Sequence, residues 1–460
     1  MPPPIPASSK RVGGASRTIL IFVGVIVLFP LLLTTLLAGR HLLLARKINK
    51  KLAQIRSSHE PITGLELASY YEHLPLDTNG AALYKQAFTA IRNGASHKFL
   101  EDTLELFEGT NALPTNLRQS MVKAVADNQA AFAPLHKAAT FGPCRFPIDY
   151  TNGWWTLLLH LRDIPVCARL ELCDGALKAQ SGDVDGSIKS VELICKYADS
   201  LNDEPDFNAA MIQGSIDNQA YNLSFWLLNH RNLSVAQLAT LQKIFGNREP
   251  AHWVDRSIIG DRCATLILFD QPPGYLLSLL APGDPKVSDV LRIWLMRFLG
   301  RGKLDELTYL NRLDDIRAAA NLPFPESLDR ADSLTTAIRT EARANSLSVT
   351  GGFLPPFLRS IRRDALHLAR MRLIELALSI EQYRIQHRTL PEDLDSLNLP
   401  DETILIDPFD GQQIRYEASR QGYKLHSVGP DRNDDGGKVS IELYSKEQVP
   451  LGDITASVER

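Results

Sequence analysis

The chain has 460 residues, of which 44% are hydrophobic and 22% are charged, proportions that are ordinary for a folded globular protein and exclude wholesale disorder. Its 50 Lys and Arg residues against 53 Asp and Glu residues give a net charge of −3, which excludes a general nucleic-acid binder. Five cysteines without a Cys-x-x-Cys pair exclude a disulfide scaffold.

The first predicted element is a membrane-spanning helix over residues 18–39, after a short N-terminal tail, residues 1–17. The run TILIFVGVIVLFPLLLTTLLAG carries no charge. As a helix it would be about 33 Å long, enough for a hydrocarbon core of about 30 Å. It lacks the polar stripe of a buried core helix, and it is longer than the apolar region of a cleaved signal peptide, which is the alternative.

A basic connector, residues 40–64, follows the predicted span. Six Lys or Arg residues lie between Arg40 and Arg56, and only Lys10, Arg11 and Arg17 precede the span. Counted alone, these charges would place the following chain in the cytoplasm.

The connector also has a helical apolar stripe, formed by Ala45, Ile48, Leu52 and Ile55. Three interpretations fit such a stripe. It can continue the membrane helix as a stalk, it can lie on anionic lipid headgroups, or it can pack on the body of the protein. We favour packing on the body.

A helical body is predicted over residues 65–347. Two helices of about 16 residues, separated by Gly182-Asp183, have apolar stripes at helical spacing, and the short turn makes them antiparallel neighbours. This pair weakly resembles a tetratricopeptide-type hairpin, although no second copy follows at the period of about 34 residues. Further helices are expected at about 79–94, from 114 onward, and at 206–229, 234–246, 250–269, 286–320 and 325–345.

The body contains no recognisable catalytic constellation. There is no Gly-x-Ser-x-Gly elbow, no phosphate-binding loop, and no His-x-x-x-His pair of the kind that metalloenzymes use. We therefore predict that the chain is not an enzyme. The best internal boundary is Ser348–Pro356, which contains two glycines and two prolines.

The chain changes character in its C-terminal module, residues 357–460. A long helix is predicted over 358–387, and turn-forming residues follow it. Short strands are predicted over 413–417, 423–428 and 438–444.

Four phrases of this module resemble the C-terminal domain of the type II secretion major pseudopilin: Ala377-Leu378 to Tyr383, Thr389-Leu390-Pro391, Asp407-Pro408-Phe409 and Tyr423-Lys424-Leu425-His426-Ser427-Val428-Gly429. The whole chain resembles bacterial membrane-anchored proteins that carry this module after a helical body. A pseudopilin also has a prepilin-peptidase site and joins the module directly to its apolar helix. This chain has neither feature, which argues against a pilus subunit.

The resemblance implies a calcium ion in the loop that follows the Tyr-x-Leu-x-Ser strand. Independently, Asp431, Asn433, Asp435 and Glu442 satisfy the spacing of a calcium loop, in which alternate oxygen ligands converge on one cation. The flanking strands and Lys438 depart from an EF-hand. The alternative is a solvent-exposed Asp-Gly turn that binds nothing.

We interpret the chain as a mainly α, single-pass protein of the inner (cytoplasmic) membrane, with a helical body and a small α+β pseudopilin-like domain that contains a short antiparallel sheet. The expected function is non-catalytic protein–protein interaction or scaffolding at the envelope, with an unidentified protein partner. The alternatives are a secretion-system component and an envelope hydrolase. The calcium prediction and the resemblance favour an extracytoplasmic body, whereas the charge count opposes it.

Overall fold

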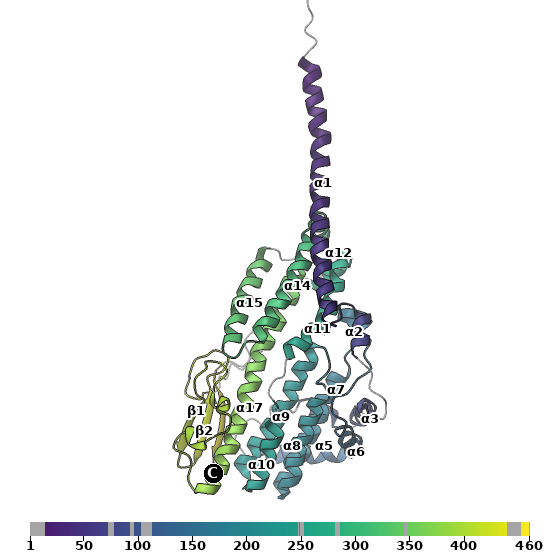
Figure 1. Ribbon diagram of the computed structural model, residues 1–460. Coiled ribbons are helices and arrows are strands. Elements are labelled where there is room, and N and C mark those ends of the chain that lie inside the picture. Colours follow the sequence, from purple (N-terminus) through teal and green to yellow (C-terminus); the bar gives the residue numbers. More distant parts are fainter. Residues whose placement is uncertain are drawn as a thin grey trace, which may run out of the picture.

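The computed structural model describes residues 14–71, 78–92, 96–102, 113–246, 248, 253–280, 286–344, 348–438 and 452–459. Over these residues the protein is mainly helical, with one three-stranded antiparallel sheet near the C-terminus. Figure 1 shows the longest helix, α1 (Gly14–Ser57), projecting from the body.

Helix α1 unites the predicted span and most of the predicted connector in one continuous helix. The part of α1 from Leu28 onward is long and apolar enough to cross a membrane, and its most apolar stretch is not buried by the body. Farther along, Leu44 and Ile48 are buried and Leu52 and Ile55 pack against the core. The apolar stripe of the connector therefore packs on the body.

The body follows as a series of helices that enclose one large hydrophobic core and two smaller hydrophobic clusters. Most of the predicted helices are present, with the segment after Pro114 divided in two. The helices before the C-terminal module are α2 (Gly64–Tyr70), α3 (Ala81–Arg92), α4 (His97–Asp102), α5 (Thr115–Asp127), α6 (Gln129–Ala138), α7 (His160–Ser181), α8 (Val184–Asp199), α9 (Phe207–His230), α10 (Val235–Phe245), α11 (Trp253–Leu266), α12 (Pro273–Leu280), α13 (Val287–Phe298), α14 (Arg301–Ala320), α15 (Glu326–Ala344) and α16 (Val349–Phe353), with short 3-10 helices η2 (Tyr150–Trp155) and η3 (Ile267–Asp270).

Helices α7 and α8 form the predicted hairpin. Gly182 has a φ of +93°, a left-handed conformation that glycine adopts without strain, and it ends α7. The Asp183 carboxylate then accepts a hydrogen bond from the Gly186 backbone N–H and caps α8. The hairpin is thus confirmed, whereas its likeness to a tetratricopeptide repeat stays a prediction.

A buried carboxylate joins this hairpin to α6. The Glu171 side chain is fully buried and accepts hydrogen bonds from Ser190 and Tyr197 of α8, at 2.8 and 3.1 Å. His136 of α6 lies 2.9 Å from the same carboxylate. Because a buried carboxylate is costly without such partners, these contacts fix the three helices in one arrangement.

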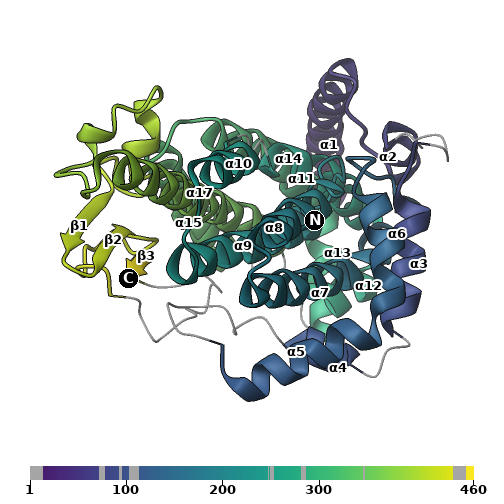
Figure 2. The same ribbon diagram turned by 90° about the horizontal axis from the view of Figure 1, so that it is seen from below.

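The C-terminal module begins with α17 (Pro355–His387) and continues through two short 3-10 helices, η4 (Asp395–Leu397) and η5 (Glu402–Leu405), to the sheet. Strands β1 (Arg415–Ser419), β2 (Gly422–Ser427) and β3 (Ile454–Glu459) pair in that order, all antiparallel. Figure 2 shows α17 between the sheet and helices α9 and α10, all of which it contacts. The core therefore continues from the body into the module.

Two of the three predicted strands are present near their expected positions. The third prediction, 438–444, lies outside the described residues except for Lys438, and β3 supplies the third strand of the observed sheet. Asn229 of α9 covers the edge of β3, because its side chain bonds the Ser457 carbonyl and the Glu459 N–H. Such cover protects a sheet edge from pairing with other chains.

Candidate functional site

The Asp407-Pro408-Phe409 turn packs directly against the end of β2. The buried Asp407 carboxylate accepts hydrogen bonds from the backbone N–H groups of Phe409 and Val428, at 3.0 and 2.8 Å, and from the Ser427 hydroxyl, at 2.9 Å. Arg415 donates to the same carboxylate at 3.2 Å. Burial raises the pKa of Asp407 more strongly than these donors lower it. Two phrases of the module that are distant in sequence are therefore joined through one side chain.

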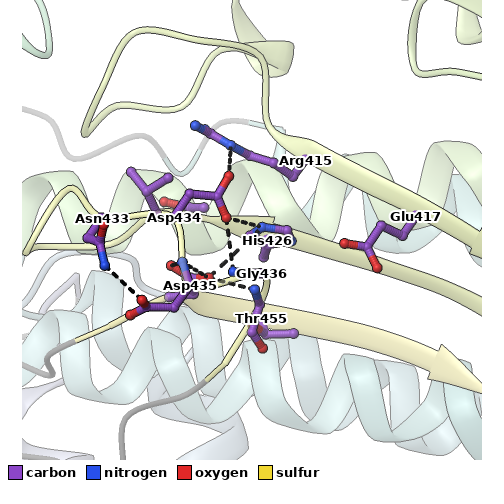
Figure 3. Close-up of polar contacts among 12 residues, drawn as sticks. Arg415, Glu417, His426, Asn433, Asp434, Asp435, Gly436 and Thr455 are labelled. Carbon is purple, nitrogen blue, oxygen red and sulfur yellow. Dashed lines mark hydrogen bonds and ion pairs between the residues drawn. The ribbon is translucent and has the colours of Figure 1, made fainter.

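The Asp-rich loop begins directly after this contact, and three of the four predicted calcium ligands lie on it. The Asn433 backbone N–H donates to the Asp431 carboxylate at 3.1 Å, and the Asn433 side-chain amide donates to the Asp435 carboxylate at 2.7 Å. Figure 3 shows Asn433 and Asp435 together on one side of the loop. The fourth predicted ligand, Glu442, lies outside the described residues.

A second group of potential ligands lies on the other side of the loop. His426 of β2, Asp434 of the loop and Asp453 before β3 each offer one ligand atom, and these atoms lie within 4.8 Å of one another. The His426 Nε2 atom is 3.1 Å from an Asp434 oxygen and 4.0 Å from an Asp453 oxygen. Figure 3 shows Asp434 pointing toward His426 and Arg415, away from Asn433.

Backbone and side-chain donors hold this second group in place. The Asp453 carboxylate is buried and accepts hydrogen bonds from the Asp435 and Gly437 N–H groups, at 3.1 and 2.6 Å. The pKa of Asp434 is lowered first by the Gly436 N–H and then by His426 and Arg415. An imidazole with two carboxylates suits a borderline cation such as Zn²⁺, whereas the oxygens of Asp431, Asn433 and Asp435 suit Ca²⁺.

Sequence reasoning missed His426 and Asp453 as members of this site. Asp434 belongs to the loop that the sequence identified, but His426 lies in the preceding strand. Asp453 becomes their neighbour only because β3 pairs with β2, with Ile454 opposite Ser427. No spacing in the sequence indicates that pairing.

The body contains a different pair of acidic groups, at a cavity of about 30 Å³. Asp206 caps α9 by accepting hydrogen bonds from the Asn208 and Ala209 N–H groups, at 2.7 and 3.2 Å, and Asp261 of α11 lines the same cavity. Burial, and then the charge of Glu204, raise the pKa of Asp206 to about 6. Burial, and then the charge of Asp206, raise the pKa of Asp261 well above its usual value.

This cavity has room for about one water molecule. The sequence contained a signal only for Asp206, as a capping residue before a predicted helix, and none for its proximity to Asp261. Two carboxyl groups whose pKa values are displaced together are typical of functional sites, but they also occur in buried structural networks.

Three comparisons with known proteins were made: with protein-family models, with curated proteins and with solved structures. None of them produced a match to this chain.

Proposed function

We propose that the chain is a non-catalytic, membrane-anchored scaffold of the bacterial envelope, whose body presents a protein-binding surface outside the cytoplasm. The observation that carries this proposal is the continuity of α1. The same helix that exposes Leu28, Leu32 and Leu36 buries Leu44 and Ile48 in the core. Because α1 is continuous from its exposed apolar part into the core, it would hold the body at a fixed height above the membrane.

Polar contacts after α1 support this rigid coupling. The Glu60 carboxylate is 2.7 Å from the nearly buried Arg262 guanidinium of α11 and 3.0 Å from that of Arg317 of α14. Burial alone would raise the pKa of Glu60, but the hydrogen bonds and charges of the two arginines outweigh it, and the pKa is lowered. An ion pair of this kind stabilises the fold above the ordinary pKa of a glutamate and is lost as the pH falls below it.

We further propose that the C-terminal module is pseudopilin-like and holds a structural calcium ion through Asp431, Asn433, Asp435 and Glu442. The resemblance and the ligand spacing support this proposal, as does the proximity of the three described members. The resemblance also favours a more specific role, as a component of a secretion system. Co-purification of the full chain with the secretion assembly would distinguish that role from general scaffolding.

The calcium proposal predicts a calcium-dependent stability. If only the folded state binds the ion, the free energy of unfolding rises by about 2.7 kcal/mol when free calcium is hundredfold above Kd. The detergent-solubilised full chain should therefore melt at a higher temperature with calcium than with chelator, and magnesium should have less effect because it demands a tighter octahedral shell. Thermal unfolding followed by circular dichroism measures this.

Two charge-matched double variants make the test specific. Asp431→Asn with Asp435→Asn should abolish the calcium response, whereas Glu392→Gln with Glu402→Gln, which removes two exposed carboxylates elsewhere in the module, should keep it. Identical melting of the wild-type chain with calcium and with chelator would refute the calcium proposal. If Asp434→Asn lost the response and the first double variant kept it, the cation would be bound by His426, Asp434 and Asp453 instead.

A hydrolase is the second candidate, and the displaced pKa values of Asp206 and Asp261 are the observation that favours it. Acid–base catalysis needs such displaced carboxyl groups, but it also needs room for a substrate. A cavity of about 30 Å³ admits about one water, so we favour binding over hydrolysis. Turnover of any ester, peptide or glycoside by the purified chain, lost in Asp261→Asn, would reverse this preference.

A further inference from the structure

Helix α13 is apolar on two faces, and only one of them is covered by the protein. Ile293 is buried and packs with Leu277 of α12 and Val349 of α16. The other face, which we call the outer face of α13, consists of five large exposed side chains: Val287 (84% exposed), Leu291 (69%), Trp294 (60%), Leu295 (57%) and Phe298 (59%).

The spacing of these five residues places them on a single strip of the helix. Successive residues turn by about 100°, so positions 287, 291, 294, 295 and 298 fall within an arc of about 100°. Scattered exposed apolar side chains are normal on a protein surface, but a contiguous strip of five indicates a binding surface.

The outer face of α13 ends close to the residues of α1 that directly follow its apolar segment. The His41 Nε2 atom of α1 is 3.0 Å from the carbonyl oxygen of Phe298, the last residue of α13. A Cβ atom built on Gly300 would lie 3.4 Å from the Arg40 side chain. Figure 1 shows that α12, on which α13 packs, lies at the end of the body from which α1 projects. If residues 18–39 span the bilayer, Phe298 therefore lies at the level of the lipid headgroups.

The charges around the outer face are those that an anionic membrane surface attracts. Arg40, Lys286, Arg292 and Arg301 are exposed on α13 or beside its ends, and among the described residues none of the four forms an ion pair with an acidic side chain. Helices that lie in the membrane interface have this composition, with Trp, Phe and Leu beside exposed Lys and Arg. A second protein chain would explain the apolar strip, but it would not explain both the basic residues and the position beside the membrane helix.

We propose that the outer face of α13 inserts into the interfacial region of the same bilayer that α1 crosses, with anionic phospholipid as its ligand. The body thereby has two attachments to the membrane, α1 and α13. The proposal rests on the proposed membrane anchor, and it goes beyond it because the anchor alone would leave the body free to tilt about its point of exit. With both attachments, one side of the body is fixed toward the lipid.

Single cysteines can report this contact in the full chain, because the five native cysteines are all buried and should not be labelled. Leu295→Cys is labelled with an environment-sensitive fluorophore and the chain is reconstituted into phosphatidylcholine vesicles with about a quarter phosphatidylglycerol. Lipids that carry a doxyl quencher near the headgroup are then added. Val235→Cys at the start of α10, at the far end of the body, is the negative control, and Leu36→Cys in α1 is the positive control.

The proposal predicts that doxyl lipid quenches the label at position 295 at least about twofold more than the label at position 235, and that quenching decreases in vesicles without phosphatidylglycerol. Equal quenching at 295 and 235, with strong quenching at position 36, would overturn the α13 contact while leaving the anchor intact. Absence of quenching at position 36 as well would refute the anchor together with the contact. A label at 295 that is shielded only at high protein concentration and is insensitive to doxyl lipid would overturn the proposal in favour of self-association.

Discussion

Asp206 illustrates a residue whose local role and electrostatic environment oppose each other. As the cap of α9 it is well suited, because its carboxylate accepts two backbone N–H groups. Beside Asp261 and Glu204 it is poorly suited, because burial and like charge raise its pKa to about 6. Carboxyl groups that reduce stability in this way are typical of sites retained for function.

We predict that Asp206→Asn stabilises the protein at neutral pH. Asparagine caps helices as well as aspartate does, and it removes the charge. Well below the ordinary pKa of an aspartate, the carboxyl is protonated in both the folded and the unfolded state. Above pH 6 it is ionised in both, and the ionised folded form bears the cost. The variant should gain about 1–2 kcal/mol at pH 7, a value discounted for the partial exposure of the side chain.

Chemical denaturation of the wild-type chain and of Asp206→Asn across this range measures the effect. The gain should shrink as the pH falls from 6 to 4. A variant less stable than wild type at pH 7 would show that the charge at this position is favourable.

At the residue scale, the sequence predicted the loop but only part of the candidate site. Asp431, Asn433 and Asp435 could be found because their spacing is local, and Asp434 lies among them. Asp453 could not be found, because it approaches His426 only through strand pairing across more than twenty residues, a contact that local spacing does not encode.

At the scale of elements, the approach of α11 to the segment before α9 depends on one glycine. A Cβ atom added at Gly260 would lie only 1.6 Å from the Pro205 carbonyl oxygen, inside van der Waals contact. Because this carbonyl belongs to the backbone, the helix itself would have to move. The packing also positions Asp261 beside Asp206.

We predict that Gly260→Ala destabilises the protein by about 1–3 kcal/mol, the usual cost of overpacking a close contact. Gly274→Ala in α12 is the matched control, since no heavy atom lies within 4 Å of its added Cβ. The control should be neutral or slightly stabilising, because alanine favours helix more than glycine does. Thermal unfolding of both variants in detergent tests this, and equal melting temperatures would contradict the close packing.

The helices of the body could largely be predicted from sequence, because apolar periodicity and capping residues are local signals. The α7–α8 hairpin is the clearest example, since Gly182 marks the end of α7 and Asp183 marks the start of α8. The sheet was harder to predict. Register and partner in a sheet depend on residues distant in the chain, and β3 was identified only in the structure.

At the scale of the whole molecule, α1 and the body form one unit. Lys51 forms an ion pair with Asp314 of α14, and Ile48 is buried in the core. The burial of α1 in the body therefore begins near Leu44, beyond the apolar segment. Removal of residues 1–40 should leave the core of the body complete.

Alkaline carbonate extraction of membranes tests the central claim most directly, because it releases peripheral proteins and leaves proteins with a spanning helix in the membrane. We predict that the full chain stays in the membrane pellet, and that a chain lacking residues 1–40 enters the supernatant even if α13 binds lipid at neutral pH. Release of the full chain by carbonate would contradict the membrane anchor. A truncated chain that resisted carbonate would contradict the assignment of residues 18–39 as the segment that provides it.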